Sequence, residues 1–364
     1  MTARPPARRG TDTGDPVTER QQATRSCVGP GRVNLIGDHT DYNAGRALPM
    51  AIGLGVTVTF APDGGDVIEV ASDAYPGERA GFPVVTDTDA VRELEPAWAR
   101  LTAAVASLAR PDHGGELRIA STVPRGSGLS SSAALAVALA EVFGVGGEAP
   151  VVAALCQAAE HRIGVPVGIM DPLVCAGGRA GHALWIDTST TSTRQVPVPP
   201  DAEFTVVDSQ VRRDLRTSPY ALRVAECEAA AAVVGPLGLA GPVDLPALRD
   251  PLLRRRARHV ITECERVDEF AAALADGRLA DAGAAMDASH ASLAGDFEAS
   301  TGAVDDLVAD LRARPGVLGV RMTGAGWGGC VVALARPGAL EPAEPSRVAW
   351  RVSPVDGTVA RRAG

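Results

Sequence analysis

The sequence predicts an α+β chain in which strands and helices are mixed in both halves. Its 364 residues are too many for one small core, and 46% of them are apolar, which is enough to fill two packed layers. Short stretches of alternating polar and apolar residues indicate strands, and longer Ala- and Leu-rich stretches indicate helices. A segment rich in Ser, Thr and Pro at 188–200 separates the halves, and we expect a domain boundary close to it.

The N-terminal half begins with an Arg-, Pro- and Thr-rich stretch that lacks the apolar core of a signal peptide. We expect residues 1–26 to form a disordered tail and residues 27–195 to form the first domain. The residue periodicity then predicts alternating element types. The predicted strands are 56–60, 67–70, 117–121 and 183–187, and the predicted helices are 91–108, 130–143 and 150–162.

The C-terminal half, residues 196–364, forms the second predicted domain and is richer in long helices. Its predicted helices are 221–234, 251–275, 279–297 and 303–314, and its predicted strands are 204–208, 317–322 and 330–335.

Charge and composition exclude several classes of function. The formal net charge of −9 disfavours nucleic acid and anionic membranes as partners, since both attract basic surfaces. All 35 basic residues are Arg, so a Walker A loop, a protein-kinase strand Lys and a pyridoxal-phosphate Schiff base are all unavailable. Aromatic residues make up only 4%, so a bound sugar would be held mainly by hydrogen bonds.

The cysteines and the hydropathy pattern bear on the compartment. Six cysteines occur without CxxC spacing, which predicts reduced thiols. No apolar stretch reaches the roughly 20 residues that a membrane-spanning helix needs. We therefore expect a cytoplasmic protein, while the sequence gives no indication of its oligomeric state.

Two glycines and three consecutive serines lie where a predicted strand is followed by a predicted helix. Gly126 and Gly128 let the backbone approach a ligand, and the helix N-terminus attracts phosphate without a Lys. The serine hydroxyls can cap the helix, bind phosphate oxygens or hold Mg²⁺. The structural alternative is an ordinary serine-capped helix. We expect this loop to bind ATP through Gly126, Ser127, Gly128, Leu129, Ser130, Ser131 and Ser132.

A second polar cluster lies at 30–43 and contains Arg32, Asp38, His39 and Asp41. Carboxylates and an imidazole on one turn suit a ligand with many hydroxyl groups. The alternative is an Asx-rich surface turn without a ligand.

Asp171 stands in an apolar, glycine-flanked stretch. A buried carboxylate there requires a partner, and Arg32 is the natural one. Taken alone, Asp171 before Pro172 also has the pattern of a helix N-cap. Four glycines at 324–329 indicate either a tight turn or a close approach of the backbone to a ligand.

Together these segments resemble the three signature motifs of the GHMP small-molecule kinases, and the first, 31–43, resembles that of the galactokinase family. The other two are 124–133 and 322–330, and the resemblance covers residues 27–336 in the family's order. It implies an N-terminal domain like the second domain of ribosomal protein S5 and a ferredoxin-like C-terminal domain. ATP and sugar would lie in the cleft between them, and the sugar would be phosphorylated at its anomeric hydroxyl.

The resemblance also implies roles for individual residues. Asp171 would be the catalytic base, and Arg32 would pair with it and stabilise the anomeric oxyanion. Sugar contacts would come from Asp38, His39, Asp41, Gly168 and Tyr220, Mg²⁺ ligands from Ser132 and Glu160, and the glycine motif would include Gly324 and Gly326.

Two positions depart from the galactokinase pattern, which usually has Glu at position 38 and Gln at position 172. The shorter Asp38 makes room for a larger substituent at C6 of the sugar. Three hypotheses follow. The chain is a galactose 1-kinase, an anomeric kinase for a modified or chain-extended sugar in secondary metabolism, or a non-catalytic sensor of sugar and ATP. Asp171, Arg32 and the three serines are all present, which favours a kinase.

Overall fold

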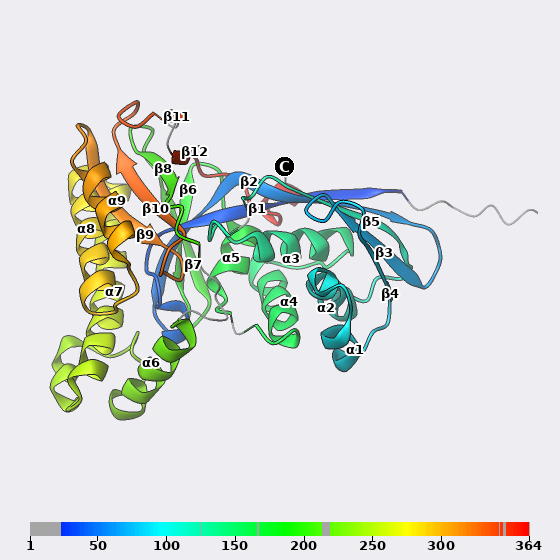
Figure 1. The fold of residues 1–364 in the computed structure, drawn as a ribbon, viewed down its shortest axis with the longest axis horizontal. Coiled ribbons are helices and arrows are strands. Elements are labelled where there is room, and N and C mark those ends of the chain that lie inside the picture. The colour runs from blue at the N-terminus through cyan, green and yellow to red at the C-terminus, as the bar shows by residue number, and fades with distance from the viewer. Residues whose placement is uncertain are drawn as a thin grey trace, which may run out of the picture.

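The computed structural model describes residues 23–124, 126–165, 167–212, 219–341, 343–344 and 347–363, and its strands form two sheets (Figure 1). Residues 1–22 of the predicted tail lie outside the described residues, whereas the first strand already begins at Arg25. The expected mixture of helices and strands in both halves is confirmed. The proposed division at residue 195 falls inside strand β7 and stays a prediction.

The first sheet has the strand order β4-β3-β5-β2-β6-β7, with β1 paired antiparallel to β2. The long strands β1 and β2 run from this sheet toward the second one (Figure 1). The bounds are β1 (Arg25–Ile36), β2 (Arg46–Pro62), β3 (Val67–Ser72), β4 (Arg79–Pro83), β5 (Gly115–Ser121), β6 (His182–Asp187) and β7 (Ser192–Pro197).

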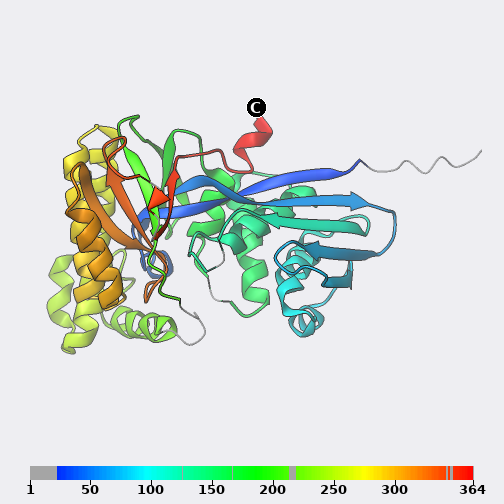
Figure 2. The same ribbon diagram turned by 45° about the horizontal axis from the view of Figure 1, so that its top comes forward.

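Five helices lie together on one side of the first sheet (Figures 1 and 2). The Ala- and Leu-rich α3 is buried almost all round because it packs on β1 and β2 and against its neighbouring helices. The bounds are α1 (Thr88–Glu93), α2 (Arg100–Ala109), α3 (Ser131–Val142), α4 (Ala149–Arg162) and α5 (Met170–Gly177), with short 3₁₀ helices η1 (Asp41–Asn43) and η2 (Ala97–Ala99).

The second sheet has the order β11-β12-β8-β10-β9, and its pairs are antiparallel. Helices α8 and α9 pack on β9, and α7 packs on α8 and on the inner ends of β1 and β2. The strands are β8 (Glu203–Asp208), β9 (Val317–Thr323), β10 (Cys330–Ala335), β11 (Ala343–Glu344) and β12 (Arg347–Val352). The helices are α6 (Tyr220–Val234), η3 (Pro242–Ala247), α7 (Pro251–Ala275), α8 (Leu279–Gly295), α9 (Gly302–Arg312) and η4 (Ala360–Ala363).

The structure corrects one predicted helix and adds one strand that the sequence did not predict. The single helix predicted at 91–108 is broken between α1 and η2, because Pro96 lacks an N–H and disfavours helical geometry at the residue before it. The segment 188–200, close to which we expected a domain boundary, contains β7. This strand lies at the edge of the sheet with most side chains exposed. Its sequence is therefore polar and lacks the apolar alternation that indicates a strand.

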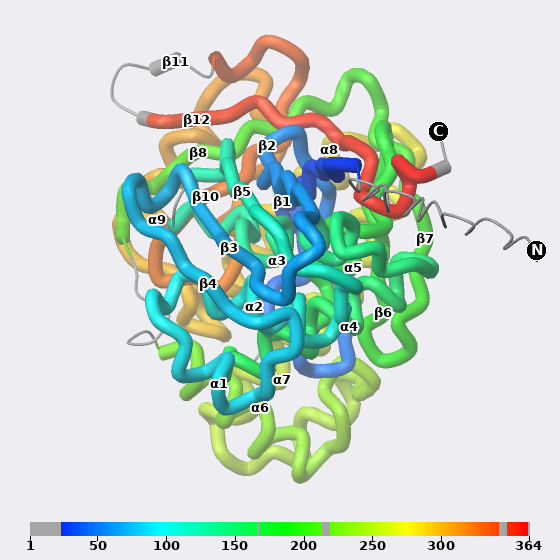
Figure 3. The backbone as a smooth tube through the Cα atoms, turned by 90° about the vertical axis from the view of Figure 1, so that its right-hand side faces the viewer, coloured from blue at the N-terminus to red at the C-terminus, as the bar shows by residue number. Residues whose placement is uncertain are grey.

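The last described residues return from the second sheet to the first layer. The Val355 N–H donates to the Ala51 carbonyl oxygen at 3.1 Å, and the Thr358 N–H donates to the Cys175 carbonyl oxygen at 3.1 Å. The Arg361 Nη1 donates to the Val28 carbonyl oxygen at 2.8 Å. Both ends of the described chain therefore lie against the same layer, as Figure 3 shows in a view from the right-hand side of Figure 1.

Two sequence expectations concern the whole chain. All six cysteines lie within the described residues, and no disulfide joins any of them, as predicted. Among the residues that the structure describes, no helix is both long enough and apolar enough to cross a bilayer.

Candidate active site

The candidate active site is centred on an ion pair between Arg32 of β1 and Asp171 in the first turn of α5. The Arg32 Nε donates to Asp171 Oδ1 at 2.6 Å, and Nη2 donates to Oδ2. Burial would lower the pKa of Arg32, but the Asp171 carboxylate outweighs burial and raises it. The expected pairing of these two residues is confirmed, and the guanidinium stays charged.

The N-cap geometry considered for Asp171 is wrong. Ile169 occupies the N-cap position of α5, so Asp171 is the second residue of the helix and Pro172 the third. Pro172 is tolerated there because first-turn N–H groups have no partner within the helix. The Asp171 carboxylate is turned to Arg32 instead of capping the helix.

Residues 126–130, before α3, form a loop that we call the phosphate loop, and it turns sharply because three of its residues have left-handed backbone geometry. The φ angles are +72° at Gly126, +75° at Gly128 and +60° at Ser130. Arg32 links this loop to β1 through two hydrogen bonds. Its Nη1 donates to the Gly128 carbonyl oxygen at 2.6 Å, and its backbone N–H donates to the Leu129 carbonyl oxygen at 3.1 Å. The loop leads into the N-terminus of α3, where free N–H groups and the helix dipole favour an anion.

The three serines make different contacts. Ser130 is the N-cap residue of α3, but its side chain makes no capping bond; its Oγ donates to Asp171 Oδ2 at 2.5 Å. The left-handed backbone explains this, because a capping residue normally has extended geometry. Ser131 is exposed at the helix start, and Ser132 lines a small cavity together with Glu160.

Ser132 and Glu160 offer oxygen atoms of the kind that Mg²⁺ prefers. Together with Asp171 they line a small cavity between α3, α4 and α5. Burial raises the pKa of Glu160, and the Ser132 hydrogen bond opposes this rise. Among the described residues no group of three or more His, Cys, Asp or Glu side chains could hold a metal by itself. A Mg²⁺ ion held by Ser132 and Glu160 would take its other ligands from water or phosphate.

We call residues 37–45, between β1 and β2, the sugar turn. Its His39 is buried in a group of aromatic rings. His39 and Tyr220 were predicted as sugar contacts, whereas the other rings of the group were not predicted to lie here. The His39 Nδ1 lies 2.9 Å from the Tyr42 hydroxyl, and the ring centroid of His39 lies 5.9 Å from that of Tyr220 and 4.5 Å from that of Phe297. The Trp327 ring, from the glycine-rich turn, completes the group at 6.2 Å.

Asp41 lies directly against Gly168. A Cβ atom added to Gly168 would overlap Asp41 Oδ2, so only glycine leaves room for this carboxylate. Burial and the nearby charges of Asp171 and Asp38 raise the pKa of Asp41 to about 7. Two segments, 38–41 and 168–171, thus bring their carboxylates together in one acidic site.

Asp38 is placed differently from the other sugar-turn residues. Its Oδ2 pairs with Arg321 Nη2 at 2.7 Å, and its Oδ1 accepts from Asn34 Nδ2 at 2.9 Å and from the Gly324 N–H at 3.0 Å. Burial raises the pKa of Asp38, and Arg321 opposes this rise. Both oxygens have protein partners, so the structure does not support the expected sugar contact of Asp38, which stays a prediction.

Residues 324–329 form a tight turn between β9 and β10, and we call this segment the glycine turn. Gly324 and Gly326 have φ angles of +84° and +89°. The Gly329 N–H donates to the Val211 carbonyl oxygen at 3.1 Å, and the adjacent Arg212 Nη1 is the nearest group to Gly126, 4.0 Å from an added Cβ. The glycine turn and the phosphate loop therefore both adjoin residues 211–212.

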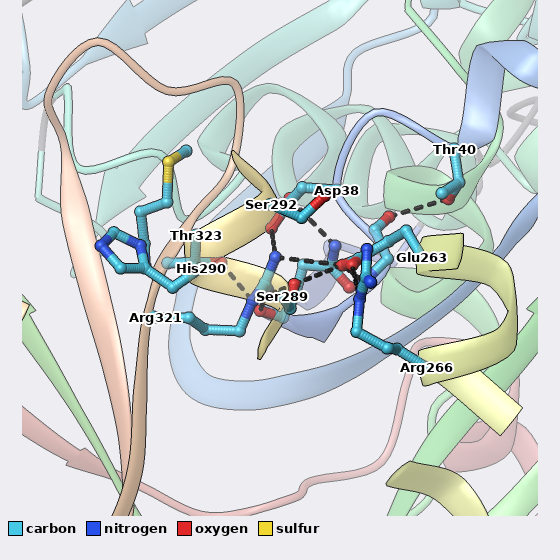
Figure 4. Close-up of polar contacts among 12 residues, drawn as sticks. Asp38, Thr40, Glu263, Arg266, Ser289, His290, Ser292, Arg321 and Thr323 are labelled. Atoms are coloured by element: carbon cyan, nitrogen blue, oxygen red, sulfur yellow. Dashed lines mark hydrogen bonds and ion pairs between the residues drawn. The ribbon is translucent and has the colours of Figure 1, made fainter. Parts of the chain in front are cut away.

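Sequence reasoning missed the residues that hold these turns in place. Arg321 of β9 and Glu263 of α7 are both fully buried, and they contact the sugar turn (Figure 4). A signal was present, since Arg321 is a charged residue inside an otherwise apolar predicted strand. Phe297 and Trp327 carried no such signal.

Three protein-family models match the chain. The galactokinase galactose-binding signature matches residues 19–62, the N-terminal domain of GHMP kinases matches 96–179, and their C-terminal domain matches 270–346. A galactokinase from Mycobacterium tuberculosis is 42% identical over 331 residues, which covers 85% of this chain and 89% of that one. A galactokinase from Canis lupus familiaris is 40% identical over 321 residues and covers 84% and 82%.

Solved structures with this fold include the galactokinase of Lactococcus lactis complexed with galactose. It has a TM-score of 0.84 and 28% sequence identity, and the match covers 93% of this chain and 96% of that one. The mevalonate kinase of Methanococcus jannaschii matches at a TM-score of 0.66 and 19% identity over 92% and 99% of the chains, which supports the fold alone. The predicted two-domain fold class is confirmed.

Proposed function

This chain belongs to the galactokinase family of the GHMP kinases, and we propose that it transfers the γ-phosphoryl group of ATP to the anomeric hydroxyl of α-D-galactose. The products would be ADP and α-D-galactose 1-phosphate. The chain is thus a phosphotransferase with a sugar hydroxyl as acceptor. The observation that supports the transfer chemistry is the position of Asp171, which Arg32 and Ser130 hold beside the phosphate loop.

Asp171 is the proposed general base. Its carboxylate takes the proton of the anomeric hydroxyl as the sugar oxygen attacks the γ-phosphorus, a contribution typically worth about 10²–10⁴-fold. Arg32 holds both carboxylate oxygens and carries a positive charge that stabilises the developing oxyanion. The Ser130 hydroxyl donates to Asp171 Oδ2 and further restricts the orientation of the carboxylate.

The phosphate loop and the start of α3 are the proposed binding site for the phosphates of ATP. Backbone N–H groups and the helix dipole supply the positive field that a Lys supplies in other kinases, and this chain has no Lys. Ser132 and Glu160 would hold Mg²⁺, which neutralises phosphate charge when bound. Gly324 and Gly326 would let the glycine turn approach the nucleotide.

The sugar would be bound by the sugar turn and the residues facing it. Asp41, held against Gly168, accepts hydrogen bonds from sugar hydroxyls, while His39 and Tyr220 line the same region. We also propose a cytoplasmic location, supported by six cysteines that form no disulfide within the described residues.

A second candidate substrate is a sugar that is modified or extended at C6. The observation that favours it is the contact of Asp38 with Arg321 and Gly324, which draws this short carboxylate away from the proposed role at C6. The same kinase chemistry would then act on a larger substrate.

The test is ATP consumption with galactose, its C2, C4 and C6 variants and sugars extended at C6, with phosphorus NMR of each product. We expect galactose to be the best substrate and the new phosphate to be on C1. Asp171→Asn should abolish turnover, and the variant should bind a non-hydrolysable ATP analogue with unchanged affinity. A better C6-extended substrate would support the second candidate, and a phosphate at another carbon would overturn the mechanism. Binding of both ligands without transfer in a single turnover would establish the sensor hypothesis.

A further inference from the structure

A group of buried charges lies where the sugar turn meets the second sheet (Figure 4). Arg321 and Glu263 are 0% exposed and Asp38 is 3% exposed. Charges are costly to bury unless they are paired and hydrogen-bonded. Arg32 and Asp171 form their hydrogen bonds and ion pair with each other, with Ser130 and with the Gly128 carbonyl oxygen, so the proposed transfer step does not account for these three side chains.

Arg321 uses its whole guanidinium to join segments that are distant in sequence. Its Nη1 donates to the Leu35 carbonyl oxygen of β1 at 3.2 Å, and its Nε donates to Ser289 Oγ of α8 at 3.1 Å. Its Nη2 lies 2.7 Å from Asp38 Oδ2 and 3.5 Å from Glu263 Oε1. A planar cation with several donors suits this role, whereas an ammonium group would not reach all of these partners.

Glu263 holds both Arg321 and the sugar turn. Its Oε1 accepts from the Gly37 N–H at 3.0 Å and from Ser289 Oγ at 2.5 Å. Burial would raise the pKa of Glu263, but Arg321 together with His259 and Arg266 lowers it to about 2. The carboxylate is therefore ionised and holds the first residue of the sugar turn in place.

Asp38 connects this group to the glycine turn. One carboxylate oxygen faces Arg321, and the other accepts from the Gly324 N–H at 3.0 Å. The glycine turn in turn adjoins the phosphate loop through residues 211–212. A single carboxylate thus bridges the turn proposed to bind the sugar and the turn proposed to approach the nucleotide.

We propose that Asp38 is a positioning residue that couples sugar binding to nucleotide binding, with Arg321 and Glu263 holding its carboxylate. The inference rests on the proposed function, since it takes galactose and ATP as the two ligands. Ordering of the sugar turn by galactose fixes Asp38, and Asp38 fixes the Gly324 amide. The coupling is reciprocal, so each ligand tightens the other by the same factor.

The experiment measures the dissociation constant of a non-hydrolysable ATP analogue with Mg²⁺, in the presence and absence of saturating galactose, on the full chain. For the unmodified protein we expect galactose to tighten the analogue by about fivefold or more. Asp38→Asn should bring this ratio close to one. An amide has one acceptor oxygen and one donor nitrogen, so in either orientation it faces Arg321 or the Gly324 N–H with a donor.

Two further variants separate coupling from a loss of stability. Ser289→Ala removes an uncharged hydrogen-bond partner of both Arg321 and Glu263, and it should also lower the ratio. It therefore tests the coupling even where Asp38→Asn does not fold. Glu203→Gln is the matched control, because it weakens another ion pair, Arg351 Nε to Glu203 Oε2 at 3.0 Å, at the opposite end of β8 from the glycine turn. It should lower the melting temperature and leave the ratio unchanged.

The outcomes distinguish the two proposals. A protein that binds the analogue but no galactose overturns the proposed substrate. A protein that binds both with a ratio of one, or folded Asp38→Asn and Ser289→Ala variants that keep the full ratio, overturns the coupling while leaving the proposed function intact. A ratio that Glu203→Gln abolishes equally would also overturn it.

Discussion

The guanidinium of Arg32 spans the distance between Asp171 and the phosphate loop. It holds both carboxylate oxygens of Asp171, and its Nη1 donates to the Gly128 carbonyl oxygen at 2.6 Å. One side chain of β1 therefore sets the separation between the proposed base and the backbone that would hold the γ-phosphate. Positioning at this scale is worth several powers of ten in rate.

Arg32→Lys should lower kcat by about 10²-fold or more, because an ammonium group cannot hold two carboxylate oxygens and the Gly128 carbonyl together. The KM for ATP should change much less. Steady-state kinetics with galactose checks both values. Arg312→Lys is the control, since Arg312 forms a partly exposed pair with Asp287 and should leave kcat unaltered. A kcat near normal in Arg32→Lys would contradict the role of Arg32.

Gly168→Ala should raise the KM for galactose by about tenfold or more, since its added Cβ would overlap the Asp41 carboxylate and displace it. Affinity for the ATP analogue should stay unchanged. Calorimetric titration with each ligand separates the two effects. Gly146→Ala, where an added Cβ meets no atom within 4 Å, is the matched control. Equal galactose affinity in both variants would argue against Asp41 as a sugar ligand.

Galactose binding should depend on pH through Asp41, whose pKa is about 7. Below that pH the carboxyl group carries a proton, and an ionised carboxylate accepts sugar hydroxyls better than a protonated one. The dissociation constant for galactose should therefore fall as the pH rises from about 5.5 to 8.5. Asp41→Asn should bind more weakly and show a flat profile. A profile in Asp41→Asn that matches the unmodified protein would assign the titration to another group.

Acid stability should depend on Glu263. Its pKa is about 2 in the folded chain, against 4.5 for an ordinary glutamate, so its stabilising contribution is present above pH 4.5 and is lost as the pH falls toward 2. Between pH 6 and pH 3 this residue should account for a loss of about 2 kcal/mol in the free energy of unfolding. Urea unfolding at the two pH values checks this. Glu263→Gln, though less stable at pH 6, should lose correspondingly less on acidification.

The parts of the site that were predictable from sequence depend on local signals. The loop 126–132 combines glycines, serines and a following Ala- and Leu-rich helix within one short segment, and α3 forms where that pattern indicates. The pairing of Arg32 with Asp171 follows from the cost of burying a lone carboxylate. The local signal of Pro96 was present but was outweighed by the helical periodicity on either side of it.

The remaining parts depend on contacts between distant segments. Asp38, Glu263 and Arg321 come from three elements separated by more than fifty residues, and no spacing rule brings them together. His39 and Trp327 likewise meet only because β1 and β9 end side by side. Ser130 was open to three interpretations, and its left-handed backbone decided against capping.

The return of residues 354–363 to the first layer bears on the order in which the protein forms during synthesis. Strands β1 to β7 and the helices between them leave the ribosome first, yet the contacts of β1, β2 and α5 with Val355, Thr358 and Arg361 require residues made some 150 positions later than the end of β7. The N-terminal part of a chain generally begins to fold while translation continues. Part of the surface of this layer therefore stays uncovered until the C-terminal residues have been synthesised. The residues that are synthesised last thus complete the layer that is synthesised first.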